Sequence, residues 1–188
     1  MDLYEFLRKF SPIDRQPFEK LTSCLQPKNY LKGDQLVVAG TVQKEMYFIE
    51  EGIQMCHYDE ELKTHVFAFT YPPNICVMPE SFAQQKPSLY AVTCLTNTRT
   101  LCLSYNNMEH LFDEFPELER LFRKINERLL AQLLNRHLEF RTQPIEERFR
   151  LFCKRSGHLL HKVPHKYIAS YLGIDATNFS KLFNTVKI

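Results

Sequence analysis

The 188-residue chain has no tryptophan and only five glycines, and it lacks the short motifs that mark common enzyme classes. It contains no GxxxxGK[ST] phosphate loop, no GxGxxG, no GxSxG and no HExxH. These absences argue against a P-loop nucleotidase, a dinucleotide-dependent oxidoreductase, a serine hydrolase and a zinc protease. The sequence therefore predicts that the protein is not an enzyme.

The chain also has no apolar run near the roughly 20 residues that a membrane helix needs. Residues 1–5 include two acids and no apolar leader, so no signal peptide is expected. Its six cysteines are scattered without a CxxC pair, which makes an iron–sulfur cluster improbable and fits reduced thiols. We expect a cytoplasmic protein without a membrane contact and without a bound metal.

The charge that is present is unevenly distributed. The chain carries 24 basic and 22 acidic residues, a net charge of +2. Residues 141–188 hold nine basic and three acidic residues, which leaves the rest of the chain at −4. A basic C-terminal segment on an acidic body is typical of a protein that binds a polyanion with one end.

The segment Pro164–Phe183 has the pattern of a helix-turn-helix. Ile168, Ala169 and Leu172 share one face of a first short helix, and Gly173 can end it in the left-handed conformation. Asp175 or Thr177 can cap a second helix, whose buried face would carry Phe179, Leu182 and Phe183. In such a motif the second helix enters the DNA major groove. A plain helical hairpin is the alternative.

A long helix is predicted over residues 116–141. Apolar residues recur there at spacings of three and four, and a helix of 25 residues would span roughly 37 Å. One small domain cannot easily bury so long a stripe, so we expect a homodimer. The expected dimer interface consists of Leu118, Phe122, Ile125, Leu129 and Leu133.

The N-terminal part changes pattern at residue 30. Residues 1–27 predict short helices, whereas residues 30–104 contain short β-type runs that are separated by turn signals. Examples are the run Met46–Ile49, which ends before Gly52, and the pair of runs around Thr96–Thr98. This arrangement predicts a sandwich or jelly roll.

The motifs Lys32-Gly33-Asp34, Gly40, Met46–Ile49 and Gly52 resemble the opening of a cyclic-nucleotide-binding β-roll. With the long helix and the helix-turn-helix in this order, the whole chain resembles a Crp/Fnr-family transcription regulator. The resemblance implies an α+β protein with a jelly-roll sensor (a double-stranded β-helix) over residues 1–115. It further implies a dimerisation helix over 116–141 and an all-α DNA-binding domain over 142–188, whose wing is short or absent.

The segment that resembles the family's phosphate cassette departs from the cyclic-AMP-binding pattern. In members that bind cyclic AMP, the cassette supplies a Gly-Glu pair and then an Arg-Ser pair. Here Glu80 and Ser88 match, but Pro79 replaces the glycine and Pro87 falls where the arginine belongs. We expect that cyclic AMP is not the ligand and that the pocket is vestigial or binds another small effector. The expected pocket residues are Glu80, Ser81, Ser88, Leu89, Leu133 and Leu134.

The expected recognition helix departs from the family pattern as well. Family members place an Arg-Glu pair at its start and an arginine four residues beyond the Glu. The matching positions here are Ala176, Thr177 and Lys181. A bidentate arginine is therefore missing. We expect Thr177, Asn178 and Lys181 to contact bases and Ser180 and Lys166 to contact phosphates.

The partners expected from this resemblance are double-stranded DNA and a second copy of the chain, and RNA polymerase is a further partner that the family allows. A different function stays open at this point. The chain would then be a cyclic-nucleotide-binding-like module that regulates a protein partner, with its C-terminal helices as the docking hairpin. The basic C-terminal segment favours DNA over this alternative.

Overall fold

The structure is a computed structural model that describes residues 2–61 and 63–185. The chain divides into two compact units. The first comprises residues up to 56 together with 69–130, and the second comprises 57–68 together with the residues from 131 onward. This grouping differs from the limits expected from the sequence, because the 27-residue helix α5 (Pro116–Thr142) contributes to both units.

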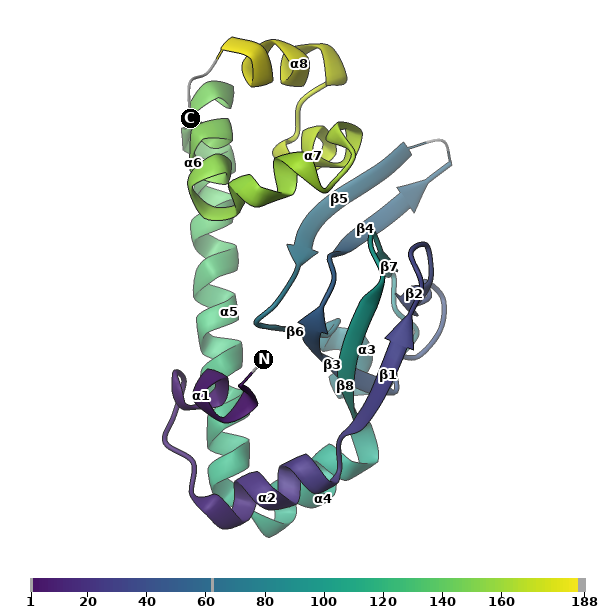
Figure 1. The fold of residues 1–188 in the computed structure, drawn as a ribbon, viewed down its shortest axis with the longest axis vertical. Helices are drawn as coiled ribbons and strands as arrows, with labels where there is room; N and C mark the ends of the chain where they lie inside the picture. Colours follow the sequence, from purple (N-terminus) through teal and green to yellow (C-terminus); the bar gives the residue numbers. More distant parts are fainter. Residues whose placement is uncertain (1, 62, 186–188) are drawn as a thin grey trace. The chain divides into compact units, whose positions relative to one another are not determined.

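Within the described ranges, eight strands form two four-stranded sheets (Figure 1). One sheet has the order β1-β8-β3-β6 and the other the order β2-β7-β4-β5, and the registered pairs are antiparallel. This confirms the predicted jelly-roll type of fold. The strands are β1 (Gln26–Tyr30), β2 (Gln35–Val37), β3 (Glu45–Glu51), β4 (Gln54–Glu60), β5 (Lys63–Thr70), β6 (Asn74–Cys76), β7 (Ala91–Cys94) and β8 (Thr98–Ser104).

Strand β3 lies inside its sheet, between β8 and β6. Its Phe48 pairs with Leu101 of β8, and Phe48 and Ile49 are fully buried. A strand that is covered on both faces reads as a continuous apolar run instead of an alternating one. The sequence Met46–Ile49 is such a run.

The turn between β3 and β4 depends on Gly52. This residue has φ = +97°, a conformation that side-chain-bearing residues rarely adopt. A Cβ atom there would lie 2.6 Å from the carbonyl oxygen of Asn97 and 2.8 Å from the Cα of Thr98. Gly33 has the same φ, but a Cβ there would meet nothing within 4 Å.

We predict that Gly52→Ala destabilises the first unit more than Gly33→Ala does. Both substitutions force an alanine into an unfavourable conformation, which costs about 1–3 kcal/mol. Only Gly52→Ala also pushes a methyl group into backbone atoms. Urea unfolding of the two variants, monitored by far-UV circular dichroism, measures their free energies of unfolding. Equal free energies of unfolding would contradict this prediction.

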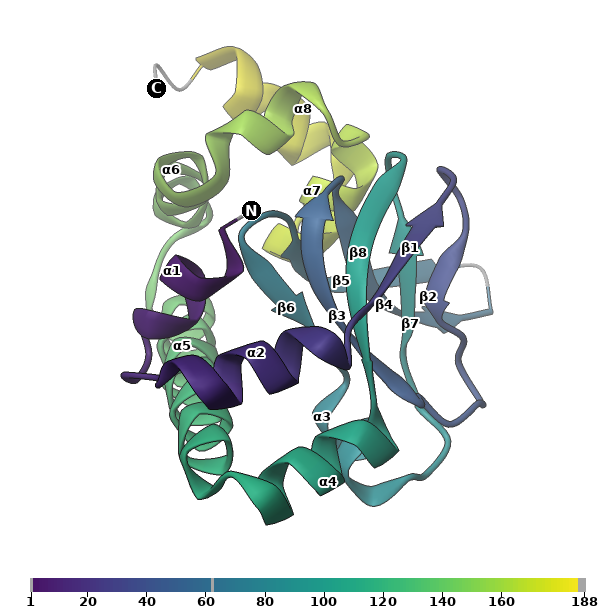
Figure 2. The ribbon, with the colours of Figure 1, turned by 60° about the horizontal axis from the view of Figure 1, so that its bottom comes forward.

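Helices α1 (Leu3–Arg8), α2 (Arg15–Ser23) and α4 (Tyr105–Glu114) pack with the first half of α5 into the core of the first unit (Figure 2). Helix α3 (Pro79–Gln84) adds Phe82 to the same core. The predicted short N-terminal helices are thus confirmed. The most deeply buried members of this cluster are Leu7, Leu21, Phe48, Leu103, Leu111, Leu118 and Leu121.

This core corrects part of the predicted dimer interface. Leu118 is 0% exposed and Phe122 is 6% exposed within the single chain, because α5 packs its first two turns against α1, α2 and α4. A side chain that is already covered gains almost nothing from a second subunit. Ile125 packs partly on the same core, and Leu129 is half-buried. Leu118 and Phe122 therefore do not belong to a dimer interface.

The helices of the second unit after α5 are α6 (Ile145–Ser156), the 3₁₀ helix η1 (Gly157–His161), α7 (His165–Leu172) and α8 (Ala176–Thr185). They enclose a small core in which Phe149, Leu159 and Ile168 are fully buried. The rings of Phe149 and Phe179 meet edge to face, with 5.7 Å between their centroids. None of the helices in the described ranges is both long enough and apolar enough to cross a membrane.

Candidate nucleic-acid interface and sensor cavity

Helices α7 and α8 are joined by the short turn at Gly173, as the sequence predicts. Gly173 lies in the left-handed region with φ = +66°. The backbone N–H of Ile174 donates to the carbonyl of Ala169 at 3.1 Å, and that of Gly173 donates to Ser170 at 3.0 Å. This is the hydrogen-bond pattern that closes a helix at a left-handed glycine. The two helices therefore have the layout of a helix-turn-helix.

Asp175 caps α8 and so resolves the choice between Asp175 and Thr177. Its Oδ1 accepts from the backbone N–H of Asn178 at 2.8 Å, and its Oδ2 accepts from the side-chain amide of Asn178 at 2.6 Å. The backbone hydrogen bond holds the pKa of Asp175 below its ordinary value. The cap fixes where α8 begins and orients Asn178.

The faces of α8 divide as predicted into a buried and an exposed side. Phe179 is 1% exposed and packs on Phe149 and on His165, whose ring centroid lies 4.9 Å away. The ring centroid of Phe183 also lies 4.6 Å from that of His165, and the rings of Phe179 and Phe183 are stacked with 6.2 Å between their centroids. The exposed side carries the expected DNA-contacting residues Thr177, Asn178, Ser180 and Lys181. Lys166, the fifth expected residue, is exposed in the first turn of α7.

Basic side chains exceed acidic ones in the helical part of this unit. Residues 131–185 contain nine lysines and arginines and four carboxylates, a net charge of +5. The carboxylates Glu139 and Glu146 pair with arginines of α5 and α6. Across the described ranges, neither Lys166 nor Lys181 forms an ion pair. The surplus cations on α7 and α8 are thus available to an anionic partner.

An arginine stack joins the end of α5 to α7, and no sequence signal pointed to it. The guanidinium of Arg136 lies 3.9 Å from the ring centroid of Tyr171 and 4.8 Å from that of Phe140. Arg148 of α6 lies 5.0 Å from Phe140. Burial lowers the pKa of Arg136, and its Nε and Nη2 atoms have no hydrogen-bond partner among the described residues. Its Nη1 donates to Glu139 Oε2 at 3.4 Å, and the cation–π contacts supply the rest of the stabilisation of this guanidinium.

We predict that Asp175→Ala frays the start of α8, whereas Asp175→Asn keeps the cap because asparagine caps almost as well. Amide hydrogen exchange at Asn178 should accelerate in Asp175→Ala at neutral pH. The pKa of Asp175 is lowered in the folded state, so its ionised carboxylate stabilises the fold above the unfolded-state pKa near 3.9. This stabilisation is lost as the pH falls through the lower pKa of the folded state. Equal exchange rates for wild type and Asp175→Ala at neutral pH would contradict the role of this cap.

In the first unit, the two serines expected to hold an effector are hydrogen-bonded to neighbouring backbone carbonyls. Ser88 is buried, its hydroxyl donates to the carbonyl of Tyr90 at 2.8 Å, and its backbone N–H donates to Thr41 at 2.8 Å. Ser81 is also buried, and its hydroxyl donates to the carbonyl of Lys86 at 2.6 Å. In contrast, Glu80 and Leu89 are exposed, and Leu89 has 61% of its surface accessible.

The remaining two expected pocket residues, Leu133 and Leu134, lie in the second unit and are 54% and 61% exposed. Together with Leu130 and Leu138 they form an exposed row on α5, which we call the leucine stripe. The stripe follows the spacing of three to four residues that keeps side chains on one side of a helix. An apolar row that is exposed to this extent is typical of a surface that another chain covers.

A separate cavity of about 640 Å³ lies in the first unit, beside the start of β3. Its volume is in the range of small-molecule sites. None of Glu80, Ser81, Ser88 and Leu89 lines it. It is lined by Leu36, Val37, Thr41, Val42, Gln43, Lys44, Glu45, Tyr47, Gln85, Ser104, Tyr105 and Asn106.

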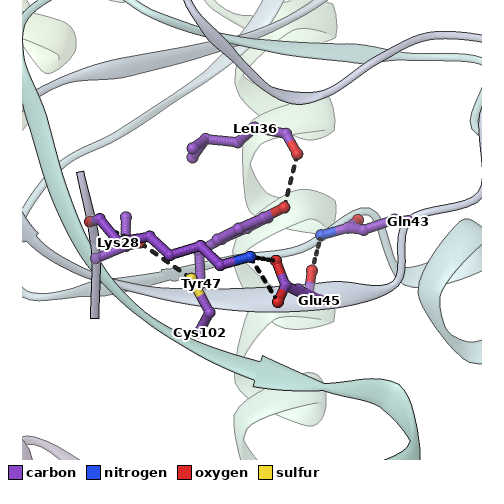
Figure 3. A network of polar contacts seen from close by, with 7 residues as sticks. Lys28, Leu36, Gln43, Glu45, Tyr47 and Cys102 are labelled. Atoms are coloured by element: carbon purple, nitrogen blue, oxygen red, sulfur yellow. Dashed lines mark hydrogen bonds and ion pairs between the residues drawn. The ribbon is translucent and has the colours of Figure 1, made fainter. Parts of the chain in front are cut away.

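Figure 3 shows that the polar groups beside this cavity are bonded to each other. Lys28 Nζ contacts both carboxylate oxygens of Glu45, at 2.8 and 2.6 Å, and the amide of Gln43 donates to the Glu45 carbonyl at 2.7 Å. The hydroxyl of Tyr47 donates to the carbonyl of Leu36 at 2.7 Å, and burial raises its pKa. In the part of the chain that the structure describes, no group of three or more His, Cys, Asp or Glu side chains is arranged to hold a metal ion.

The two-sheet roll, the long helix and the helix-turn-helix define an architecture known from solved transcription regulators. FixK2 from Bradyrhizobium japonicum is similar with a TM-score of 0.71 at 14% identity, over 85% of this chain and 83% of that chain. The c-di-GMP responsive global regulator CLP of Xanthomonas campestris is similar with a TM-score of 0.67 at 15% identity, over 91% of this chain and 90% of that one.

The catabolite activator protein of Thermus thermophilus is also similar, with a TM-score of 0.58 at 16% identity, over 93% of this chain and 84% of that chain. The chain thus has the fold of Crp/Fnr-type regulators with a cyclic-nucleotide-binding-like roll, as the resemblance predicted. No protein-family model and no curated protein matches the sequence. At these low identities the likeness establishes the fold alone.

Proposed function

We propose that the protein is a DNA-binding transcription regulator of the Crp/Fnr type that works as a homodimer and is not an enzyme. The observation that supports this most directly is the exposed face of α8. Thr177, Asn178 and Lys181 project from a helix whose other side is fixed by the buried Phe179. A capped second helix with polar residues at its start is the part of a helix-turn-helix that enters the major groove.

The electrostatic surplus supports the same proposal. Lys181 lies on the exposed face of α8 and Lys166 is exposed in the first turn of α7, and the helical part of the unit has a net charge of +5. Phosphate contacts by such side chains supply most of the affinity for DNA and make it depend on salt. In this proposal Thr177, Asn178 and Lys181 contact bases, and Ser180 and Lys166 contact phosphates.

We propose further that the roll does not bind cyclic AMP in the manner of the family. The amide and hydroxyl of Ser88 are bonded to Thr41 and Tyr90, and the neighbouring Pro87 has neither a cationic side chain nor an N–H. A phosphate at this place would lose its charge-assisted partners, which are worth about 1.5–3 kcal/mol each. If the roll binds an effector, a small molecule in the cavity beside Glu45 and Tyr47 fits better.

Lys181→Ala should weaken binding to a duplex that the wild-type chain has selected from a random-sequence pool. A base-reading contact is worth about 1–3 kcal/mol, or roughly 5- to 150-fold in Kd. Fluorescence anisotropy at fixed salt measures the change. Lys9→Ala is the matched control, since it removes an exposed lysine from the other unit.

Unchanged affinity and unchanged base preference in Lys181→Ala would refute the assigned role. The same assay separates DNA binding from docking to a protein. A DNA-binding protein loses affinity steeply as salt rises. A chain that binds no duplex even at low salt would instead favour the function as a module that regulates a protein partner.

Leu134→Glu should dissociate the proposed homodimer, because it places a carboxylate in the leucine stripe. Sedimentation velocity at micromolar concentration should then show a monomer, and affinity for a two-fold symmetric duplex should fall at least about tenfold through the loss of the second half-site. Gln132→Glu adds the same charge on another side of α5 and should leave the dimer intact. A monomeric wild type, or a dimeric Leu134→Glu, would contradict this interface.

A further inference from the structure

The second unit contains an element that the sequence assigned to the sensor. Residues 57–68, the outer part of the β4–β5 hairpin, group with the helices of this unit. The contact is made by Ser170 of α7. Its hydroxyl donates to the carbonyl of Thr64 at 2.8 Å and accepts from the backbone N–H of Val66 at 2.9 Å.

The geometry explains why a serine is suited to this position. β5 is the edge strand of its sheet, so its outer N–H and C=O groups have no strand partner. Thr64 and Val66 are two residues apart and point these groups in the same direction. A hydroxyl is both donor and acceptor, and it satisfies one group of each kind. An alanine at position 170 would leave both unpaired.

The same hairpin carries a dense group of acids next to this contact. Asp59, Glu60 and Glu61 follow one another at the end of β4, and all three are exposed. The side chain of Thr64 donates to Asp59 at 2.8 Å, and His65 contacts Glu60 at 3.2 Å. Hydrogen bonds therefore run from Asp59 through Thr64 to Ser170, in the first helix of the helix-turn-helix.

The charges of the two parts of the unit are opposite. Residues 57–68 hold three carboxylates and one lysine, a net charge of −2, whereas residues 131–185 have a net charge of +5. Charges on one compact unit within about 10 Å of each other act together on a nearby polyanion at 0.1 M salt. An acidic segment that is fixed to a DNA-binding unit therefore weakens its attraction for phosphates.

From these observations, and on the basis of the proposed DNA-binding function, we propose that Ser170 clamps the acidic β4–β5 hairpin onto the helix-turn-helix as an electrostatic brake on DNA binding. Ser170 acts as a positioning residue, since it holds the acids in place without contacting DNA. Release of the clamp moves two net negative charges away from the helices and raises the affinity for any duplex. The effect is independent of base sequence, because it acts on phosphates.

The test uses the full chain and a random-sequence duplex at low salt. Ser170→Ala should bind about 3- to 10-fold more tightly than wild type, and the difference should shrink as salt screens the charges. Ser170→Thr keeps the hydroxyl and should restore wild-type affinity. Glu60→Gln combined with Glu61→Gln removes two charges with the clamp intact and should strengthen binding by a similar factor.

Two measurements keep the outcome interpretable. Amide hydrogen exchange at Val66 should accelerate in Ser170→Ala, and in Ser170→Thr it should not. A variant that combines Ser170→Ala with Glu60→Gln and Glu61→Gln should bind DNA more tightly than wild type. The gain should be smaller than the product of the two separate gains, because acids already released from the helices no longer oppose DNA. Far-UV circular dichroism checks that each variant is folded.

Several results would overturn the brake. One is that Ser170→Ala binds DNA no more tightly than wild type although its Val66 amide exchanges faster. Another is that the Val66 amide exchanges as slowly in Ser170→Ala as in wild type. Failure of the proposed function looks different. In that case neither the wild type nor any variant binds duplex, even though the Val66 amide still responds to Ser170→Ala.

Discussion

The burial of Phe179 is the constraint on which the candidate DNA-binding surface depends. Its ring packs against Phe149 of α6 and His165 of α7, and this packing fixes the rotation of α8 about its own axis. Because successive helix residues are rotated by about 100°, burial of Phe179 leaves Asn178 on the flank of α8 and Lys181 on its opposite side, and both are exposed. The Asp175 cap then fixes the first turn, where Asn178 lies. Loss of the aromatic contact would release all of these positions together.

Helix α5 serves two different cores because its sequence changes character along its length. Its first turns bury Leu118 and Leu121 in the first unit, whereas its last turns contribute Arg136 and Phe140 to the stack with Tyr171. Between them lies the leucine stripe, which a single chain leaves exposed. Both ends of the helix thus pack inside the chain, and in our proposal a second copy of the chain covers the leucine stripe.

Some of the site could be predicted from sequence, because it rests on local rules. Gly173 is suited to the left-handed backbone that ends α7, and Phe179 is apolar and is buried. The exposed polar residues of α8 follow from the helical period. About twenty residues therefore suffice to predict the α7–α8 motif. The assignment of Leu118 to a dimer interface was wrong, since periodicity shows that a face is buried but not which partner buries it. The Ser170 contact could not be predicted either, because it joins residues more than one hundred positions apart.

The sequence by itself determined the order of elements and the basic C-terminal segment. It also determined the departures at Pro87 and Ala176, because these follow from residue identity and local spacing. Tertiary structure alone decided which apolar residues of α5 remain exposed, and that the polar groups of Ser81 and Ser88 are used inside the roll. It also decided that an edge strand of the hairpin meets α7. The physical reason is that burial and hydrogen bonding are shared between segments distant in sequence, so neither partner alone specifies the contact.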